Sequence, residues 1–267
     1  MTRPRTGLAF LDDGLDQPGA VQAFAHRGGA THPDLVGLEN THTAFAHAVA
    51  QGFRYLETDV HATRDGILLA FHDEVLDRVT DANGRIADLD HSTVRRARIG
   101  GREEIPTLAS LLEAFPGARF NIDLKSGAAV APLADLVRRT AAHDRVCVGS
   151  FSEDRVASFR RALDRPVATA CAPRAVAGLR FAPTRRLARR LSGQGNVLQV
   201  PHRRGPVRVV TAELVTRAHA VRRPVHVWTV DEPDEMHALL DLGVDGLMTD
   251  RTDVLKGVLV ARGQWRD

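Results

Sequence analysis

Residues 118–163 read ARFNIDLKSGAAVAPLADLVRRTAAHDRVCVGSFSEDRVASFRRAL and alternate short apolar runs with helical patterns. Ala118–Leu124 and Val146–Ser150 are strand-like, while Ala131–His143 and Glu153–Leu163 carry apolar residues at helical spacing. Strands that are apolar on both faces, each followed by a helix, indicate a parallel sheet that helices cover.

The same alternation extends over most of the chain. The other expected strands are Val21–His26, Tyr55–Val60, Val167–Cys171, Val197–Val200, Val225–Val230 and Gly246–Thr249. The other expected helices are Thr41–Gln51, Leu108–Phe115, Arg174–Leu191, Ala212–Val221, Pro233–Leu242 and Asp253–Ala261. Expected helix N-caps are Thr107, Ser152, Thr211 and Asp231 or Thr252. Eight strand–helix units predict a single (β/α)8 TIM barrel. An open doubly wound sheet is the alternative, although no GxGxxG follows the first strand.

One extra strand interrupts the alternation. Ile67–Phe71 is strand-like, but the gap from Val60 to Gly66 cannot hold the crossover helix that a parallel neighbour needs. The segment is therefore expected to form an antiparallel hairpin with the second strand. That pairing places Asp59 opposite the last residue of the extra strand and brings His72 beside Glu57 and Asp59.

Length and composition limit the possible organisation of the chain. The 267 residues fit one large domain, which we expect over residues 20–267 behind an N-terminal arm, residues 1–19. No apolar run is long enough to span a bilayer, so stable membrane insertion is not expected. The N-terminus has acids where a signal peptide needs an apolar core, which predicts a cytoplasmic protein. Cys147 and Cys171 are expected to be buried free thiols.

The charged residues give one specific hint. The net charge is +3, but the basic residues are scattered along the chain, so nucleic acid is not an expected partner. Of 36 basic residues only Lys125 and Lys256 are lysines. Because lysine offers a compact ammonium instead of a planar fork, Lys125 at the end of an apolar strand is a candidate functional cation.

Acidic side chains gather at the carboxyl ends of the expected strands, the face on which barrels catalyse. Glu57 and Asp59 are two residues apart and point to the same side of their strand, and Asp123 on the next strand shares this inward phase. Three carboxylates form an oxygen site that suits Mg²⁺ or Ca²⁺. A salt-bridge network with Arg27 and Lys125 is the alternative explanation for these acids.

Two histidines stand at strand ends that face the same cluster. His26 and His72 can serve as base and acid, because imidazole titrates near neutral pH. Arg27 and Lys125 suit the oxygens of a phosphate. Together with a metal ion, these residues predict phosphoryl transfer.

Five short segments connect these residues to a family. They are His26-Arg27-Gly28, Glu39-Asn40-Thr41, Glu57-Thr58-Asp59-Val60, Phe71-His72-Asp73 and Asp123-Leu124-Lys125, and their order and spacing resemble the signature of the glycerophosphodiester phosphodiesterases. Ser150-Phe151, Val227-Trp228-Thr229-Val230 and Asp245–Asp250 are similar to later strand ends of that family, so the resemblance covers residues 20 to 256.

The resemblance implies an activity and a set of roles. It implies hydrolysis of glycerophosphodiesters to glycerol 3-phosphate and an alcohol, with Mg²⁺ or Ca²⁺ as the cofactor and a small-molecule phosphodiester as the partner. The implied roles are acid–base catalysis for His26 and His72, metal binding for Glu57, Asp59 and Asp123, and phosphate binding for Arg27 and Lys125.

Further positions follow from the same resemblance. Glu39 and Asn40 are expected to line the site, Thr41 to start the first helix, and Trp228 either to wall the substrate or to fill the core. The chain departs from the family at two positions: Asp123 stands where Glu is usual, and Asp231 where Asn is usual. These departures leave the preferred ion and the fit of the substrate open, and the oligomeric state is also open.

Three other functions compete with this one. A lysophospholipase D or sphingomyelinase D-like enzyme would act on a lipid, and a large apolar rim around the site would favour it. A non-catalytic phosphate-binding barrel would have lost a histidine or a metal acid, and this chain keeps them. A nucleic-acid binder needs stacking aromatics on a basic face, which the aromatic content of 5% does not favour.

Overall fold

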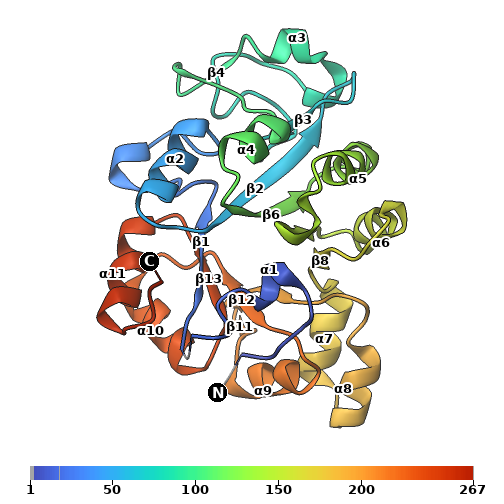
Figure 1. Ribbon diagram of the computed structural model, residues 1–267, viewed down its shortest axis with the longest axis vertical. Helices are drawn as coiled ribbons and strands as arrows, with labels where there is room; N and C mark the ends of the chain where they lie inside the picture. Colours follow the sequence, from blue (N-terminus) through green and yellow to red (C-terminus); the bar gives the residue numbers. More distant parts are fainter. Residues whose placement is uncertain (1–2, 18, 267) are drawn as a thin grey trace.

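Eight parallel strands form an α/β TIM-like barrel in the computed structural model, which describes residues 3–17 and 19–266 (Figure 1). In order around the barrel they are β1 (Gln22–His26), β2 (Tyr55–Ala62), β6 (Arg119–Leu124), β7 (Val146–Gly149), β8 (Ala168–Thr169), β9 (Leu198–Pro201), β12 (Val225–Trp228) and β13 (Gly246–Thr249). β1 pairs with both β2 and β13, and a parallel bridge between Ala170 and Val197 joins the two ends of the sheet. The open doubly wound sheet is therefore excluded.

A helix follows each barrel strand and lies on the outside of the barrel. These helices are α2 (His42–Ala50), α4 (Leu108–Ala114), α5 (Val130–Arg139), α6 (Glu153–Ala162), α7 (Pro173–Phe181), α9 (Ala212–Ala220), α10 (Pro233–Asp241) and α11 (Thr252–Ala261). Short 3-10 turns lie at η1 (Pro33–Leu35), η2 (Ile86–Asp88), η3 (Gly127–Ala129) and η4 (Ala142–Asp144).

The alternation of side chains along a strand separates the core from the site. On β6, Phe120, Ile122 and Leu124 are fully buried in the apolar layer beneath the helices. Asn121 and Asp123, between them, face the opposite way and line the cleft described below. Successive residues of a strand point to opposite faces, so one strand supplies both the packing and the chemistry.

Side-chain capping explains where several helices begin. The hydroxyl oxygens of Thr41, Thr107, Ser152 and Thr211 each accept a hydrogen bond from a backbone N–H in the first turn of the following helix. Such caps satisfy donors that the helix itself leaves unpaired. The predicted starts at these four residues are confirmed.

The remaining cap prediction is wrong for both candidates. Glu232 precedes α10 without a capping bond, and Thr252 is the first residue inside α11. The Asp231 carboxylate instead accepts hydrogen bonds from the Thr249 hydroxyl and the Asp250 N–H, so it ties β13 to the preceding loop.

The single helix expected over 174–191 is also wrong. The chain forms α7 and then α8 (Arg185–Leu191), separated by Ala182, Pro183 and Thr184. A residue before proline is driven out of the helical region, and Ala182 has ψ 133°. Thr184 then caps α8 by accepting a hydrogen bond from the Leu187 N–H.

β3 (Leu68–Ala70) pairs antiparallel with β2, with Val60 opposite Ala70, and the Phe71 N–H donates to the Asp59 carbonyl at 2.9 Å. The chain then forms a small lobe, at the top of Figure 1, containing α3 (His91–Val94), β4 (Arg98–Ile99) and β5 (Glu103–Glu104). This lobe has an apolar cluster of its own, which includes Phe71 and Ile99.

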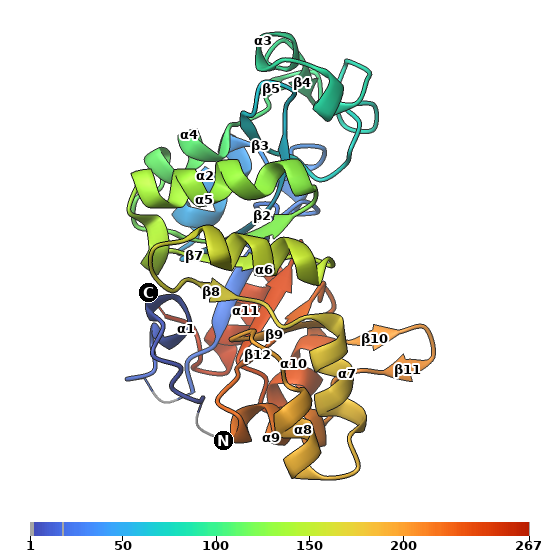
Figure 2. The same cartoon turned by 90° about the vertical axis from the view of Figure 1, so that its right-hand side faces the viewer.

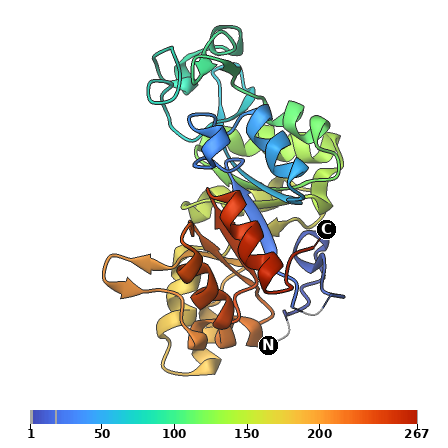
Figure 3. The same ribbon diagram turned by 90° about the vertical axis from the view of Figure 1, so that its left-hand side faces the viewer.

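The N-terminal segment packs at the amino ends of β1 and β2. In α1 (Ala9–Asp12), the Phe10 ring contacts Phe24 and Tyr55, and the Phe10 carbonyl accepts hydrogen bonds from Gln22 and Tyr55. Figure 3 shows the C-terminal segment beside it, where Arg266 pairs with Asp13 at 3.3 Å. The boundary between arm and barrel at residue 20 stays a prediction.

A second hairpin was not expected. β10 (Arg203–Arg204) and β11 (Val207–Arg208) pair antiparallel and project from the barrel near α7 (Figure 2). Cys147 and Cys171 are buried free thiols, as predicted. Every helix among the described residues is too short or too polar to cross a lipid bilayer.

Candidate active site

One cleft of about 930 Å³ opens at the carboxyl ends of the barrel strands. Part of its lining comes from strand ends, and we call these residues the strand-end part: His26, Arg27, Glu57, Asp59, His72, Asp123 and Lys125. The rest comes mostly from loops and from α7, and we call these residues the loop part: Phe151, Pro173, Val176, Arg180, Phe181, Arg204, Val207 and Val209. Trp228 lines the cleft next to Phe151, with ring centroids 5.9 Å apart, and it also packs against the buried apolar cluster that contains Phe24 and Met248.

Asp59 and Asp123 lie directly opposite each other on the paired strands β2 and β6. Lys125 bridges them, with Nζ 2.9 Å from Asp59 Oδ1 and 2.8 Å from Asp123 Oδ2. Arg27 Nε lies 3.3 Å from Asp59 Oδ2. The salt-bridge network considered as an alternative is therefore present around these two acids, and Lys125 points at carboxylates.

Glu57 differs from the other two acids because no lysine or arginine side chain pairs with it in the described chain. Its Oε2 accepts the Arg27 backbone N–H at 3.3 Å and lies 3.6 Å from His26 Nε2. Burial and the nearby charge of Asp59 raise the pKa of Glu57 to about 8. A buried carboxylate is costly unless a cation compensates it, and this donor set of three carboxylates fits a hard divalent cation.

His26 is oriented by Asp250, a residue to which sequence reasoning gave no role. Nδ1 lies 2.7 Å from Asp250 Oδ1, which leaves Nε2 directed at Glu57 and the cleft. Burial lowers the pKa of His26, but the charge of Glu57 and the hydrogen bond to Asp250 outweigh it and raise the pKa to about 9. A carboxylate on Nδ1 fixes the tautomer of an imidazole.

His72 has a corresponding arrangement. Its Nδ1 lies 2.5 Å from Asp73 Oδ1, and its carbonyl accepts a hydrogen bond from His61 Nε2 at 3.1 Å. Arg78 Nε donates to Asp73 at 2.6 Å. The hydrogen bond from Arg78, helped by that from His72, lowers the pKa of Asp73 to about 2, so this carboxylate is ionised at neutral pH.

The part of Glu39 and Asn40 in the site stays a prediction, and the structure shows both residues in contact with the strand-end part. Among the described residues neither lines the cleft: Glu39 pairs with Arg27 at 3.2 Å and with Arg78 at 2.7 Å, behind the strand-end part. Buried Asn40 accepts the Thr58 hydroxyl and approaches Asp59. Glu39 therefore contacts Arg27, and Asn40 approaches Asp59 at 3.5 Å.

Two non-glycine residues adopt the left-handed conformation at this point of the chain. Arg27 has φ 49° and Asn40 has φ 60°, and the Asn40 N–H donates to the Arg27 carbonyl at 2.8 Å. Such conformations cost free energy and persist where surrounding contacts enforce them, often at functional sites. They turn the Arg27 guanidinium toward Asp59 immediately after β1.

Most of the loop part was missed by sequence reasoning. Arg180 and Phe181 come from α7, and Arg204 and Val207 come from the second hairpin. None of them stands at the end of a barrel strand or in a recognisable motif. Gln199 on β9 also lines the cleft and donates to Asn121 Oδ1 at 2.7 Å.

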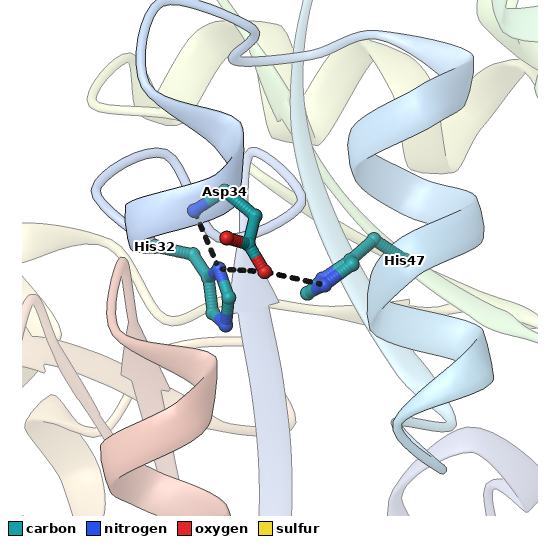
Figure 4. A group of neighbouring side chains, drawn as sticks. All are labelled: His32, Asp34 and His47. Atoms are coloured by element: carbon teal, nitrogen blue, oxygen red, sulfur yellow. Dashed lines mark hydrogen bonds and ion pairs between the residues drawn. The ribbon is translucent and has the colours of Figure 1, made fainter.

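A second group of possible metal ligands lies outside the cleft: His32, Asp34 and His47 (Figure 4). Asp34 Oδ2 lies 3.9 Å from a ring nitrogen of each histidine. Zinc ligands about 2.0–2.2 Å from the ion would lie roughly 3.4 Å apart. The Nδ1 lone pair of His32 already accepts the Asp34 N–H at 3.1 Å. In this arrangement the three side chains are a polar cluster between η1 and α2.

Comparison with known proteins adds independent findings. The family described as Glycerophosphoryl diester phosphodiesterase family matches residues 26–254. A Mycobacterium tuberculosis protein named "Probable glycerophosphodiester phosphodiesterase 2" is 44% identical over 246 residues, which cover 91% of this chain and 92% of that protein.

Two solved structures share the fold of this chain. A Silicibacter pomeroyi crystal structure assigned as a glycerophosphoryl diester phosphodiesterase has a TM-score of 0.78 at 25% identity, covering 96% of this chain and 99% of the other. An Oleispira antarctica phosphodiesterase in complex with the product sn-glycerol-3-phosphate has a TM-score of 0.76 at 22% identity, covering 90% and 96%.

Proposed function

The chain belongs to the glycerophosphoryl diester phosphodiesterase family and is a phosphoric diester hydrolase, and we propose that the strand-end part carries out the hydrolysis. The reaction cleaves a glycerophosphodiester to glycerol 3-phosphate and an alcohol. One observation supports the proposal most: two histidines, each with a carboxylate on Nδ1, line one cleft together with three carboxylates on adjacent strands.

Glu57, Asp59 and Asp123 would hold the divalent cation, Mg²⁺ or Ca²⁺. The burial of Glu57 without a lysine or arginine partner among the described residues and the all-oxygen donor set support this assignment. When bound, the ion would supply Lewis-acid stabilisation of charge on the phosphoryl oxygens. The shorter side chain of Asp123 is already within reach of the other acids, since Lys125 spans Asp59 and Asp123.

His26 and His72 would move the protons. We assign one of these two imidazoles as the base that activates the nucleophile and the other as the acid that protonates the leaving alcohol. The nucleophile is either water or the glycerol 2-hydroxyl, whose attack would give a cyclic phosphate that water then opens. Asp250 and Asp73 hold the Nδ1 atoms, which leaves the Nε2 atoms for the reaction. The Arg27 guanidinium, positioned by Glu39, would donate to phosphate oxygens, as would Lys125 once its two acids bind the cation.

A product assay tests this proposal. The purified protein is treated with EDTA and given glycerophosphocholine, glycerophosphoethanolamine or glycerophosphoglycerol, with or without added Mg²⁺ or Ca²⁺, while glycerol 3-phosphate is measured. We expect release only with a divalent cation, and a loss of at least about 100-fold in Glu57→Gln. Full activity in EDTA, or in Glu57→Gln, would refute the metal assignment.

A lipid substrate is the second candidate, and the loop part favours it. Phe151 and Phe181 line the cleft with side chains 69% and 64% exposed, and Val176 and Val207 lie beside them. Exposed apolar surface at a site indicates an apolar ligand. A kcat/KM for lysophosphatidylcholine above that for glycerophosphocholine would support a lysophospholipase D-like preference, and the reverse order would exclude it.

A further inference from the structure

The positive charge of the chain is concentrated in one segment instead of being scattered as expected. Residues 165–212 contain no Asp or Glu and ten arginines: Arg165, Arg174, Arg180, Arg185, Arg186, Arg189, Arg190, Arg203, Arg204 and Arg208. The segment therefore carries +10, whereas the remainder, with 26 basic and 33 acidic residues, carries −7. The interpretation of the basic residues as scattered is wrong for this segment.

Much of this charge is exposed and unneutralised. Arg186, Arg189 and Arg190 on α8 and Arg203 and Arg208 on the second hairpin are all exposed. Across residues 3–17 and 19–266, none of these five makes an ion pair. About half of the arginines outside this segment pair with an acid in the described chain, whereas these five exposed arginines lie in a segment that has no acidic residue of its own.

α7 connects the two arginine-bearing elements, because it packs on α8 and borders the same cleft as the hairpin. α8 packs on α7 so closely that an added Cβ at Gly178 would lie 2.5 Å from the Leu191 Cβ. Phe181 at the end of α7 and Val207 on the hairpin line the same cleft. Figure 2 shows the hairpin projecting beside α7, with α8 below.

Large apolar side chains accompany these arginines. Phe181, Leu187, Leu191 and Val207 are 64%, 37%, 46% and 47% exposed. Cations attract an anionic lipid surface, and apolar side chains among them can enter the boundary between headgroups and acyl chains. A surface that binds nucleic acid would need several aromatic side chains on which bases can stack. Phe181 is the single Phe, Tyr or Trp in residues 165–212.

We propose that this surface, the basic face, docks on an anionic phospholipid bilayer. The basic face consists of Arg186, Leu187, Arg189, Arg190 and Leu191 on α8, Phe181 on α7, and Arg203, Val207 and Arg208 on the hairpin. Because Phe181 and Val207 also border the cleft, docking brings the cleft mouth to the lipid surface. The docking is peripheral and does not depend on the hydrolysis proposed above.

Vesicle sedimentation of the full chain tests the proposal. We expect the protein to pellet with vesicles of phosphatidylcholine and phosphatidylglycerol, to stay in solution with phosphatidylcholine alone, and to be released by salt. Arg203→Gln/Arg208→Gln is the test variant, because neither residue lines the cleft. Each arginine near an anionic surface contributes about fivefold in binding, so this variant should lose tenfold or more.

The matched control is Arg95→Gln/Arg96→Gln, which removes the same charge from exposed, unpaired arginines of the small lobe. It should bind within about twofold of wild type, and both variants should keep their thermal midpoint and their turnover of soluble glycerophosphocholine. Equal losses in the two variants would show a mere net-charge effect and overturn the proposal. So would failure of wild type to pellet with anionic vesicles, or tighter binding to duplex DNA than to those vesicles.

Discussion

The two parts of the cleft are built in different ways. The acids of the strand-end part stand on β2 and β6, and the register of these strands puts Asp59 opposite Asp123. Glu57 and Asp59 are buried, with only 5% and 2% of their surface exposed. The loop part takes Phe151, Phe181 and others from connections outside the barrel, and these two side chains are 69% and 64% exposed.

This difference separates the reaction from the choice of substrate. Strand ends of a closed barrel are rigid, so they can hold groups to the accuracy that proton transfer and metal binding need. Loops vary without disturbing the barrel, so they can adapt to the alcohol or the lipid attached to the phosphate. Substitutions in the strand-end part should therefore change the turnover rate. Substitutions in the loop part should change which substrate the protein prefers.

The largest expected effect is the loss of an imidazole from the strand-end part. His72→Ala should reduce kcat on glycerophosphocholine by at least about 100-fold, since positioned acid–base groups contribute about 10²–10⁴. The half-buried His91 of α3 lies outside the cleft, so His91→Ala is the control and should keep its kcat. Thermal melting checks that both variants fold. Near-normal turnover in folded His72→Ala would contradict the assignment of catalysis to the strand-end part.

An intermediate effect is expected in the loop part. Phe181→Ser should raise the KM for lysophosphatidylcholine about tenfold, because part of a phenyl ring's burial of about 1.5–3 kcal/mol is lost. The KM for glycerophosphocholine should change little, because that substrate has no acyl chain to contact Phe181. Val260→Ser on α11 serves as the control, since Val260 is 55% exposed and does not line the cleft. Equal changes for both substrates would remove the distinction between the two parts.

The smallest effect concerns Asp250, which positions His26 without lining the cleft. In the metal-free protein, NMR titration of His26 should give a pKa of about 9, above its ordinary value of 6.5. Asp250→Asn removes one of the carboxylates that raise it, so the pKa should fall. A midpoint that does not move would show that Asp250 has no electrostatic influence on His26.

The same shift predicts a dependence of stability on pH. The folded-state pKa of His26 is raised above the unfolded value of 6.5, so its contribution to stability is complete below pH 6.5 and is lost as pH rises through about 9. Chemical unfolding of the metal-free protein at several pH values measures this effect. Between pH 6.5 and about 9, the free energy of unfolding should fall less in Asp250→Asn than in wild type.

Part of the site was predictable because the governing rules are local. Alternation along a strand puts Glu57, Asp59 and Asp123 on one side, and the barrel brings strand ends together. The cap at Thr107 and the break after Ala182 also have local causes, although apolar residues at helical spacing on both sides of Pro183 conceal the break in the sequence. The extra strand was predicted from the length of the gap, and β3 pairs antiparallel with β2.

The sequence by itself determined the order of the barrel strands, the inward phase of the acids and the presence of both imidazoles, because each depends on spacing within a few residues. Only the tertiary structure decided that Asp250 orients His26, that Glu39 lies behind Arg27, and that α7 and the second hairpin wall the cleft. Those arrangements join segments far apart in the chain, and their geometry depends on how the barrel closes and how its loops pack.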